Sequence, residues 1–181
     1  GVSGKYFMVA NQFWVHKNHM TLFRAIKRLV DRGHKDIRCV CTGALKDYRN
    51  QDYYESLETF LRENGLWDHI KILGFIDRKD QLQLMKNAVA VVQPSLFEGW
   101  GTVVEDAKTL QKVIVLSDIA VHQEQKNEDC ILFGKNDDLQ LAEILEGLWE
   151  EFRQKEVRHG YQLEKAAEYG KRFYDAITSG S

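Results

Sequence analysis

A short stretch near the middle of the chain combines two acidic residues with two glycines. Glu98 precedes Gly99-Trp100-Gly101, and Asp106 follows a few residues later. The loop comes after the apolar run Ala88–Val92, which predicts a buried parallel strand, and it leads into a helical pattern that opens at Thr102, the expected N-cap residue. A glycine loop before a helix presents free backbone N–H groups and the positive end of the helix dipole to an anion. The stretch therefore predicts a phosphate or nucleotide site.

The acids beside this anion site indicate a ligand that also carries hydroxyl groups, as a sugar on a phosphate-bearing carrier does. At about 100° per residue, Val103, Ala107 and Leu110 share one helix face. Asp106 falls beside that face, and Glu105 points nearly away from it. We therefore expect Asp106 to face a site and Glu105 to be solvated. Gly-x-Gly after a strand is a short motif that also occurs by chance. The loop alone could therefore equally be an ordinary turn of a doubly wound α/β protein.

A second polar segment, Asn11–His19, follows the first predicted strand, Tyr6–Ala10. It contains Lys17, and a lysine between a strand and a helix can reach a diphosphate as a mobile point charge. His16 and His19 lie three residues apart with no carboxylate close by in this loop. That is a poor ligand set for zinc, so we expect no metal.

The alternation of strands and helices predicts an α/β fold with a doubly wound, Rossmann-like parallel sheet. In such sheets ligands bind at the carboxyl ends of the strands near the switch point, where the polar and glycine-bearing loops are expected to lie. The expected strands are 6–10, 37–42, 70–73, 88–92, 113–116 and 130–133, and the expected helices are 20–32, 51–63, 80–86 with Asp80 as cap, one opening at 102, 139–152 and 157–177.

Composition narrows the class of protein. The chain has 181 residues, 44% of them apolar, which suits one domain with a real core. A net charge of −2 gives no basis for nucleic-acid binding. No apolar stretch approaches the roughly 20 residues of a membrane helix, and no signal peptide is expected. Cys39, Cys41 and Cys130 show no zinc spacing, so we expect reduced, mostly buried thiols and a cytoplasmic protein.

The stretch Pro94–Glu124, PSLFEGWGTVVEDAKTLQKVIVLSDIAVHQE, resembles the donor-binding signature of group 1 glycosyltransferases, a large retaining family with the GT-B fold. That signature has a glutamate, an aromatic residue between glycines, and a second acid after seven intervening residues; Glu98, Trp100 and Asp106 occupy these positions. The family usually has Glu at the second acid, so Asp106 is a shorter variant. Gln111 stands where the family commonly has a helix-ending glycine.

The resemblance implies that residues 1–181 form the C-terminal, donor-binding half of a GT-B enzyme, and that an N-terminal acceptor domain lies outside this chain. The expected reaction moves a hexose from a UDP- or GDP-sugar to an acceptor with retention, for example in polysaccharide biosynthesis. Neither a metal nor another cofactor is expected. This half alone is expected to bind donor without turning it over, and any contact with the inner face of the membrane would involve the other half.

The resemblance also assigns roles to residues. Lys17 would neutralise the donor's diphosphate, Glu98 would hold hydroxyls of the donor sugar, and Asp106 would hold the ribose hydroxyls. Gln12 stands where the family has an arginine, and Glu124 lies in a loop that the family brings toward the cleft. The catalytic residues on this pattern are Glu98 and Lys17, and the donor-binding residues are Gln12, Gly74, Phe75, Ile76, Gly99, Trp100, Gly101, Thr102 and Asp106.

Three other classes of protein remain as alternatives. A non-catalytic module with a degenerate site would explain the missing arginine and the shortened acid. A nucleotide-sugar epimerase would need acid and base residues that the chain does not show at matching positions. A dinucleotide-binding Rossmann enzyme is disfavoured, because no Gly-x-Gly-x-x-Gly follows the first predicted strand.

Overall fold

The computed structural model describes residues 2, 4–47, 49–50 and 52–152. They form a six-stranded sheet in the order β3-β2-β1-β4-β5-β6, and every pair of neighbouring strands is parallel. Chain order reverses between β1 and β4, so the predicted doubly wound sheet is confirmed and its switch point lies at this pair. The strands are β1 (Phe7–Ala10), β2 (Cys39–Thr42), β3 (Ile70–Gly74), β4 (Val91–Gln93), β5 (Ile114–Ser117) and β6 (Cys130–Phe133).

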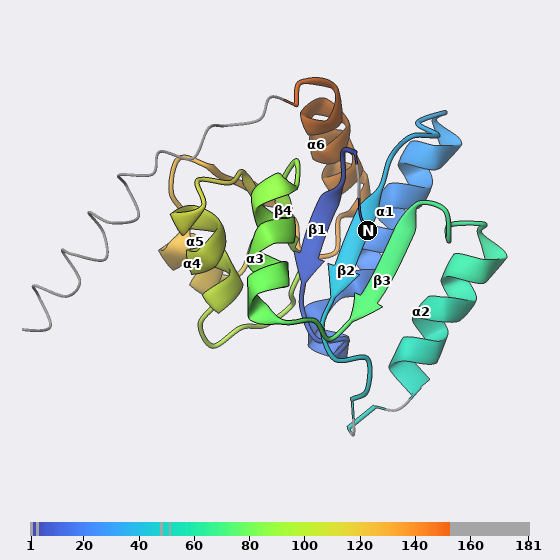
Figure 1. Ribbon diagram of the computed structural model, residues 1–181, viewed down its shortest axis with the longest axis horizontal. Helices are drawn as coiled ribbons and strands as arrows, with labels where there is room; N and C mark the ends of the chain where they lie inside the picture. The colour runs from blue at the N-terminus through green and yellow to red at the C-terminus, as the bar shows by residue number, and fades with distance from the viewer. Residues whose placement is uncertain (1, 3, 48, 51, 153–181) are drawn as a thin grey trace, which may run out of the picture.

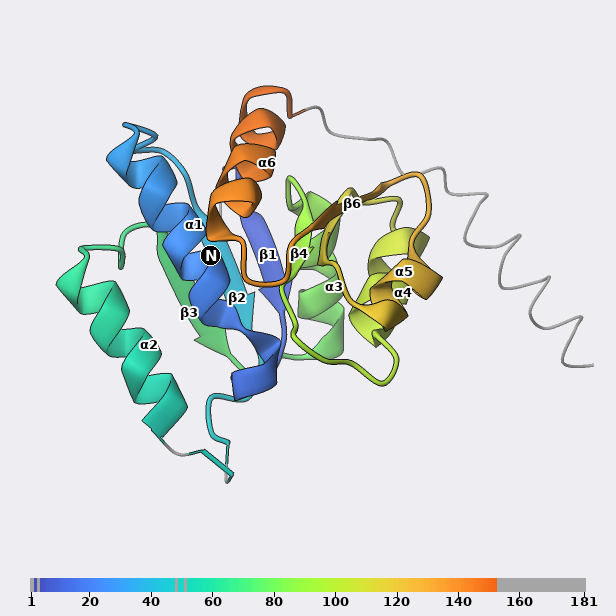
Figure 2. The same cartoon turned by 180° about the vertical axis from the view of Figure 1, so that it is seen from behind.

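Helices cover the sheet on both sides, as Figures 1 and 2 show from opposite directions. One face carries α1 (His19–Asp31), α2 (Asp52–Glu63) and α6 (Asp138–Glu150), and the other carries α3 (Arg78–Asn87), α4 (Thr102–Thr109) and α5 (Ala120–Gln125). A short 3₁₀ helix, η1 (Val15–Lys17), links β1 to α1.

Strand β1 illustrates why the central strands are apolar throughout. Phe7 and Val9 belong to the core that includes residues of α1 and α6, and Met8 and Ala10 belong to the core on the side of α3 and α4. Successive side chains of a strand point to opposite faces, so a strand that is covered on both sides needs apolar residues at every position. Each such large side chain contributes about 1.5–3 kcal/mol by leaving water.

Several element boundaries differ from those expected. The strand β4 begins at Val91, not at residue 88, and ends at Gln93 before Pro94, which cannot continue a ladder. Helix α3 begins at Arg78 with Asp77 as its cap, so the expectation that Asp80 caps it is wrong. Asp80 lies in the first turn instead, where the helix dipole also favours an acid. The helix expected at 157–177 lies outside the described residues.

Helix α4 is turned slightly from its expected orientation. Val104 and Ala107 are fully buried, whereas Val103 is only partly buried. Cys39 and Cys41 are buried free thiols with their sulfur atoms 4.0 Å apart, as expected.

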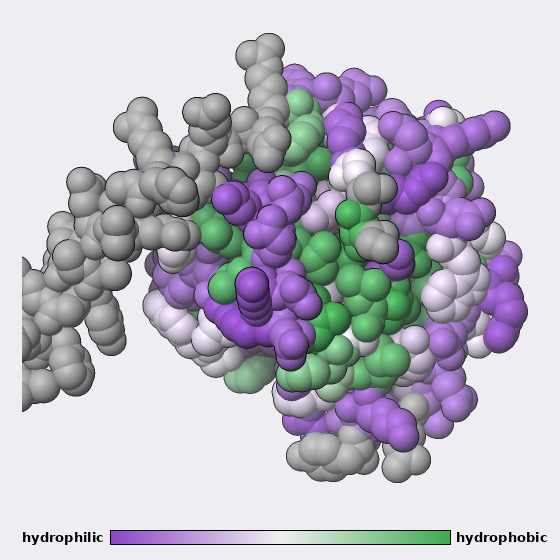
Figure 3. Space-filling view, in the orientation of Figure 1, coloured by the Kyte–Doolittle hydropathy of each residue, from purple (hydrophilic) through white to green (hydrophobic). Residues whose placement is uncertain are grey.

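The sheet face seen in Figure 1 is only partly covered. Apolar side chains gather on this face in Figure 3, and a groove of about 730 Å³ is lined by residues that include Tyr6, Leu73 and Leu84. Within residues 2–152, apart from the masked positions, none of the helices has the length and apolarity needed to cross a membrane.

Candidate functional site

The loops that follow β1 and β4 lie side by side, because these two strands are neighbours at the switch point. Asn11 and Gln93 exchange two amide hydrogen bonds, each of 3.0 Å. Asn18, which adopts the left-handed conformation with φ of 54°, donates from Nδ2 to the carbonyl of Pro94 at 3.1 Å. These contacts fix the loop of Lys17 against the loop of Glu98.

Lys17 and Glu98 form a buried ion pair across the two loops. The Lys17 ammonium lies 2.7 Å from both carboxylate oxygens of Glu98, and the two side chains are 14% and 8% exposed. Ser95 and Gln93 also donate hydrogen bonds to Glu98 Oε1, at 2.7 and 3.1 Å. Burial by itself raises the pKa of Glu98, but the hydrogen bonds from Lys17, Ser95 and Gln93 outweigh it and lower the pKa below its ordinary value. The structure thus brings together the two residues predicted to be catalytic.

Free backbone amides surround the start of α4. Gly101 is the N-cap residue of this helix and Thr102 its first helical residue, so the expectation that Thr102 is the cap is wrong. The reason is a distant side chain: Gln125 accepts from the Gly101 N–H and donates to the Gly101 carbonyl, each at 3.2 Å. Among the described residues, none accepts a hydrogen bond from the N–H of Gly99, Trp100 or Thr102. These three amides are available as anion donors, whereas that of Gly101 is occupied.

Asp106 lies near the middle of α4 and is more enclosed than its neighbour Glu105. Its side chain is 19% exposed, compared with 40% for Glu105, in agreement with the expected choice between them. Asp106 Oδ1 accepts a hydrogen bond from Arg78, and Oδ2 is buried without a partner among the described residues. Glu105 is not simply solvated, because it accepts a hydrogen bond from Gln125 at 2.9 Å.

The loop after β3 forms a third side of the candidate site, beside the loops after β1 and β4. Gly74 ends the strand with a φ of 69°, in the left-handed region that glycine adopts freely. Phe75 follows it and is 82% exposed. A pocket of about 220 Å³ is lined by Gln12 from the loop after β1 together with Phe75 and Ile76. The predicted donor-binding residues Gln12, Phe75 and Ile76 therefore share one pocket, whereas Gly74 is not among its lining residues.

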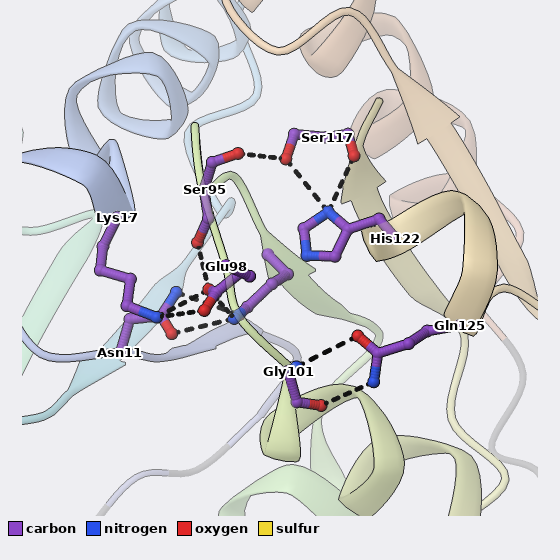
Figure 4. A network of polar contacts seen from close by, with 9 residues as sticks. Asn11, Lys17, Ser95, Glu98, Gly101, Ser117, His122 and Gln125 are labelled. Atoms are coloured by element: carbon purple, nitrogen blue, oxygen red, sulfur yellow. Dashed lines mark hydrogen bonds and ion pairs between the residues drawn. The ribbon is translucent and has the colours of Figure 1, made fainter. Parts of the chain in front are cut away.

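Helix α5 contributes two buried polar residues that the sequence did not single out, His122 and Gln125. Their spacing of three residues places them on one helix face. That spacing is the sequence signal that could have indicated that the two side chains lie together. His122 Nδ1 donates to the carbonyl of Ser117 at 2.8 Å, and Nε2 is buried without a partner in the described part of the chain (Figure 4). Glu124, on the same helix, is exposed and points away from this face.

One of the two histidines of the loop after β1 packs in the core. His19 is fully buried and stacks on Phe13 with ring centroids 4.2 Å apart. Burial lowers the pKa of His19 to about 3, so its ring is neutral. The described residues contain no group of three potential metal ligands.

This chain belongs to the group 1 glycosyltransferases: the profile of that family, described as glycosyl transferases group 1, matches residues 3–165. No curated protein matches the sequence. The Anabaena protein Alr3699/HepE in complex with UDP has a TM-score of 0.77 at 19% identity, over 97% of this chain and 49% of that one. A glycosyltransferase from Rickettsia africae gives 0.76 at 17% identity, over 99% and 50%. Sucrose-phosphate synthase from Thermosynechococcus elongatus gives 0.75 at 20%, over 97% and 46%.

These structural similarities show the fold, a Rossmann-like α/β domain that corresponds to part of a GT-B enzyme. The chain spans about half the length of each of these solved structures. Alr3699/HepE has also been solved with UDP and glucose and with UDP-glucose.

Proposed function

We propose that this chain is the donor-binding half of a retaining glycosyltransferase that moves a hexose from a UDP- or GDP-sugar to an acceptor. The observation that carries the proposal is the convergence of Lys17, Glu98 and the free amides of Gly99, Trp100 and Thr102 at the switch point of the sheet. Membership of the family supports it, as does the presence of UDP in Alr3699/HepE.

The reaction requires stabilisation of negative charge on the departing diphosphate. A preorganised site supplies it through backbone amides and a cation that already lie where the charge develops. In the structure the Lys17 ammonium is held by Glu98. The diphosphate competes for this ammonium, and its arrival releases the Glu98 carboxylate to accept hydrogen bonds from two hydroxyls of the sugar. The proposal includes no metal, because Lys17 and the amides supply the positive charge.

In this proposal the nucleoside lies beside the diphosphate, against Asp106 and the pocket formed by the loops after β1 and β3. Asp106 Oδ2, which has no partner in the described part of the chain, accepts a hydrogen bond from a ribose hydroxyl. The base lies in the pocket lined by Gln12, Phe75 and Ile76. The acceptor is bound by a second domain outside this chain, so the chain alone binds donor without transferring its sugar.

A non-catalytic module is the second candidate. Gln12 stands where the family has an arginine, and Arg78 donates a hydrogen bond to Asp106 Oδ1. Such a module would keep the fold and lose affinity for nucleotides.

Calorimetric titration tests the proposal with UDP, GDP, UDP-glucose and GDP-mannose. We expect saturable binding of one nucleotide and at least a tenfold loss of affinity in Lys17→Met. Lys27→Met is the matched control, because Lys27 pairs with Asp31 on the surface of α1, outside the site. Absence of nucleotide binding both here and in the full-length protein would establish the non-catalytic module. Sugar transfer by this chain alone would contradict the need for a second domain.

A further inference from the structure

Helix α5 presents two buried polar side chains to the loop that carries Glu98, and they differ in one respect. Gln125 uses its amide completely: Oε1 accepts from Gly101, and Nε2 donates to Gly101 and to Glu105. His122 is fully buried, yet only one of its two ring nitrogens has a partner among the residues that the structure describes. Gln125 therefore holds the loop at Gly101 in place through its hydrogen bonds. His122, in contrast, has a ring nitrogen that can still form a hydrogen bond.

The partners of His122 define its tautomer. The carbonyl of Ser117, 2.8 Å from Nδ1, can only accept, so Nδ1 carries the proton. The Ser117 hydroxyl donates to the carbonyl of Ser95, which leaves its oxygen as a second acceptor at 3.2 Å from Nδ1. Burial lowers the pKa of His122, so the ring is neutral and Nε2 is a lone-pair acceptor.

An unpaired buried acceptor is costly. Leaving such a group without a hydrogen bond costs about 1–3 kcal/mol, and an apolar residue of similar shape avoids that cost. A group of this kind in a native structure calls for an explanation such as a ligand. The ring edge that carries Nε2 is turned toward Glu98 in Figure 4, and the charges of both Glu98 and Lys17 act on the His122 ring.

We propose that His122 is a further donor-binding residue, whose Nε2 accepts a hydrogen bond from a hydroxyl of the donor sugar next to those that Glu98 holds. This inference rests on the proposed function. The chemistry selects a hydroxyl, because a neutral lone pair pairs with an O–H donor and has nothing to offer the oxygens of a diphosphate. Nε2 is buried in the structure, and the sugar reaches it when the diphosphate draws Lys17 away from Glu98.

Two substitutions separate the ring nitrogens of His122. His122→Asn keeps an N–H donor near the position of Nδ1 and removes Nε2, whereas His122→Gln places an amide oxygen near the position of Nε2. The affinities for UDP and for UDP-glucose are measured by calorimetry for each variant, with GDP and GDP-mannose in place of these if the protein binds guanine nucleotides. Thermal unfolding confirms that each variant is folded.

We expect His122→Asn to keep its affinity for UDP within twofold and to bind UDP-glucose about three- to tenfold more weakly, the value of one uncharged hydrogen bond. His122→Gln should recover part of that loss. In the unsubstituted protein, the ¹⁵N chemical shift of His122 Nε2 should change on addition of UDP-glucose and stay nearly constant with UDP. Gln125→Ala is the control for a purely structural effect, since it should weaken both ligands equally.

Equal losses for UDP and UDP-glucose in His122→Asn would make His122 a structural residue and overturn the inference. Unchanged affinity for both ligands, with a constant Nε2 shift, would also overturn it. In both cases nucleotide binding by the unsubstituted protein would leave the proposed function intact. Absence of all nucleotide binding, in this chain and in the full-length protein, would instead remove the proposed function and this inference with it.

Discussion

The ion pair between Lys17 and Glu98 allows a quantitative prediction. The substitution Lys17→Met keeps most of the unbranched side chain and removes the ammonium that lies 2.7 Å from both carboxylate oxygens. Breaking a fully buried pair from one side costs about 3–5 kcal/mol, whereas an exposed pair contributes about 0–1 kcal/mol. This pair is mostly buried, and Ser95 and Gln93 still donate to Glu98 after the substitution. We therefore expect the free energy of unfolding at pH 7 to fall by about 2 kcal/mol.

The pH dependence of that loss follows from the pKa of Glu98, which is lowered in the folded state. A lowered pKa means that the carboxylate contributes stability above its unfolded-state pKa and loses it as the pH falls through the folded-state value. The ordinary value is 4.5. The difference in stability between the unsubstituted protein and Lys17→Met should therefore be constant near pH 7 and shrink as the pH falls below 4.5.

Urea unfolding, followed by tryptophan fluorescence, measures these free energies. A double-mutant cycle with Lys17→Met, Glu98→Gln and the double variant isolates the coupling between the two side chains. A coupling energy below about 0.5 kcal/mol, which is within the scatter of independent sites, would refute the reasoning. A stability difference that does not change between neutral and acid pH would refute it as well.

Other substitutions test the loops around the site. Gly43→Ala should cost more than about 3 kcal/mol or prevent folding, because the new Cβ would lie 2.2 Å from the carbonyl oxygen of Asn11 and the φ of +134° disfavours alanine; near-normal stability in urea would contradict the tight approach of the two loops. Asp106→Asn should weaken UDP about tenfold, the value of a hydrogen bond to a charged group, and leave the affinity for inorganic pyrophosphate unchanged; an equal loss for pyrophosphate would place Asp106 at the phosphates instead of the ribose. Gln125→Ala should lower the free energy of unfolding by about 1–2 kcal/mol, because it removes the hydrogen bonds of Gln125 to Gly101. An unchanged urea midpoint would show that the loop does not depend on the Gln125 side-chain amide.

Much of the architecture could be predicted from local pattern. Continuous apolar runs such as Ala88–Val92 predicted strands covered on both faces, and the alternation of strands and helices predicted their parallel arrangement. The meeting of Lys17 and Glu98 followed from the resemblance to the family and from the rule that ligand-binding loops lie at the carboxyl ends of neighbouring strands. Residues 81 positions apart in the chain could be assigned to one site in advance, although the ion pair between them was not predicted.

The details that the sequence could not predict depend on contacts between distant segments. Gly101 and Thr102 are both good cap residues, and the side chain of Gln125, from another helix, decides between them. The burial of His122 also depends on tertiary packing, since its spacing of three from Gln125 relates the two residues but does not say which face of the six-residue α5 is the inner one. The Arg78–Asp106 contact joins two helices that no local signal relates.

Backbone amide NMR during a titration with UDP tests the central claim most directly. That claim places the diphosphate at the free amides of Gly99, Trp100 and Thr102, while Gln125 keeps the amide of Gly101 occupied. Saturating shifts at these three amides, with a smaller shift at Gly101, are the predicted result. Binding of UDP that leaves all three amides unmoved, and instead perturbs residues such as Tyr6 and Leu84 in the groove beside α3, would contradict the proposed donor site.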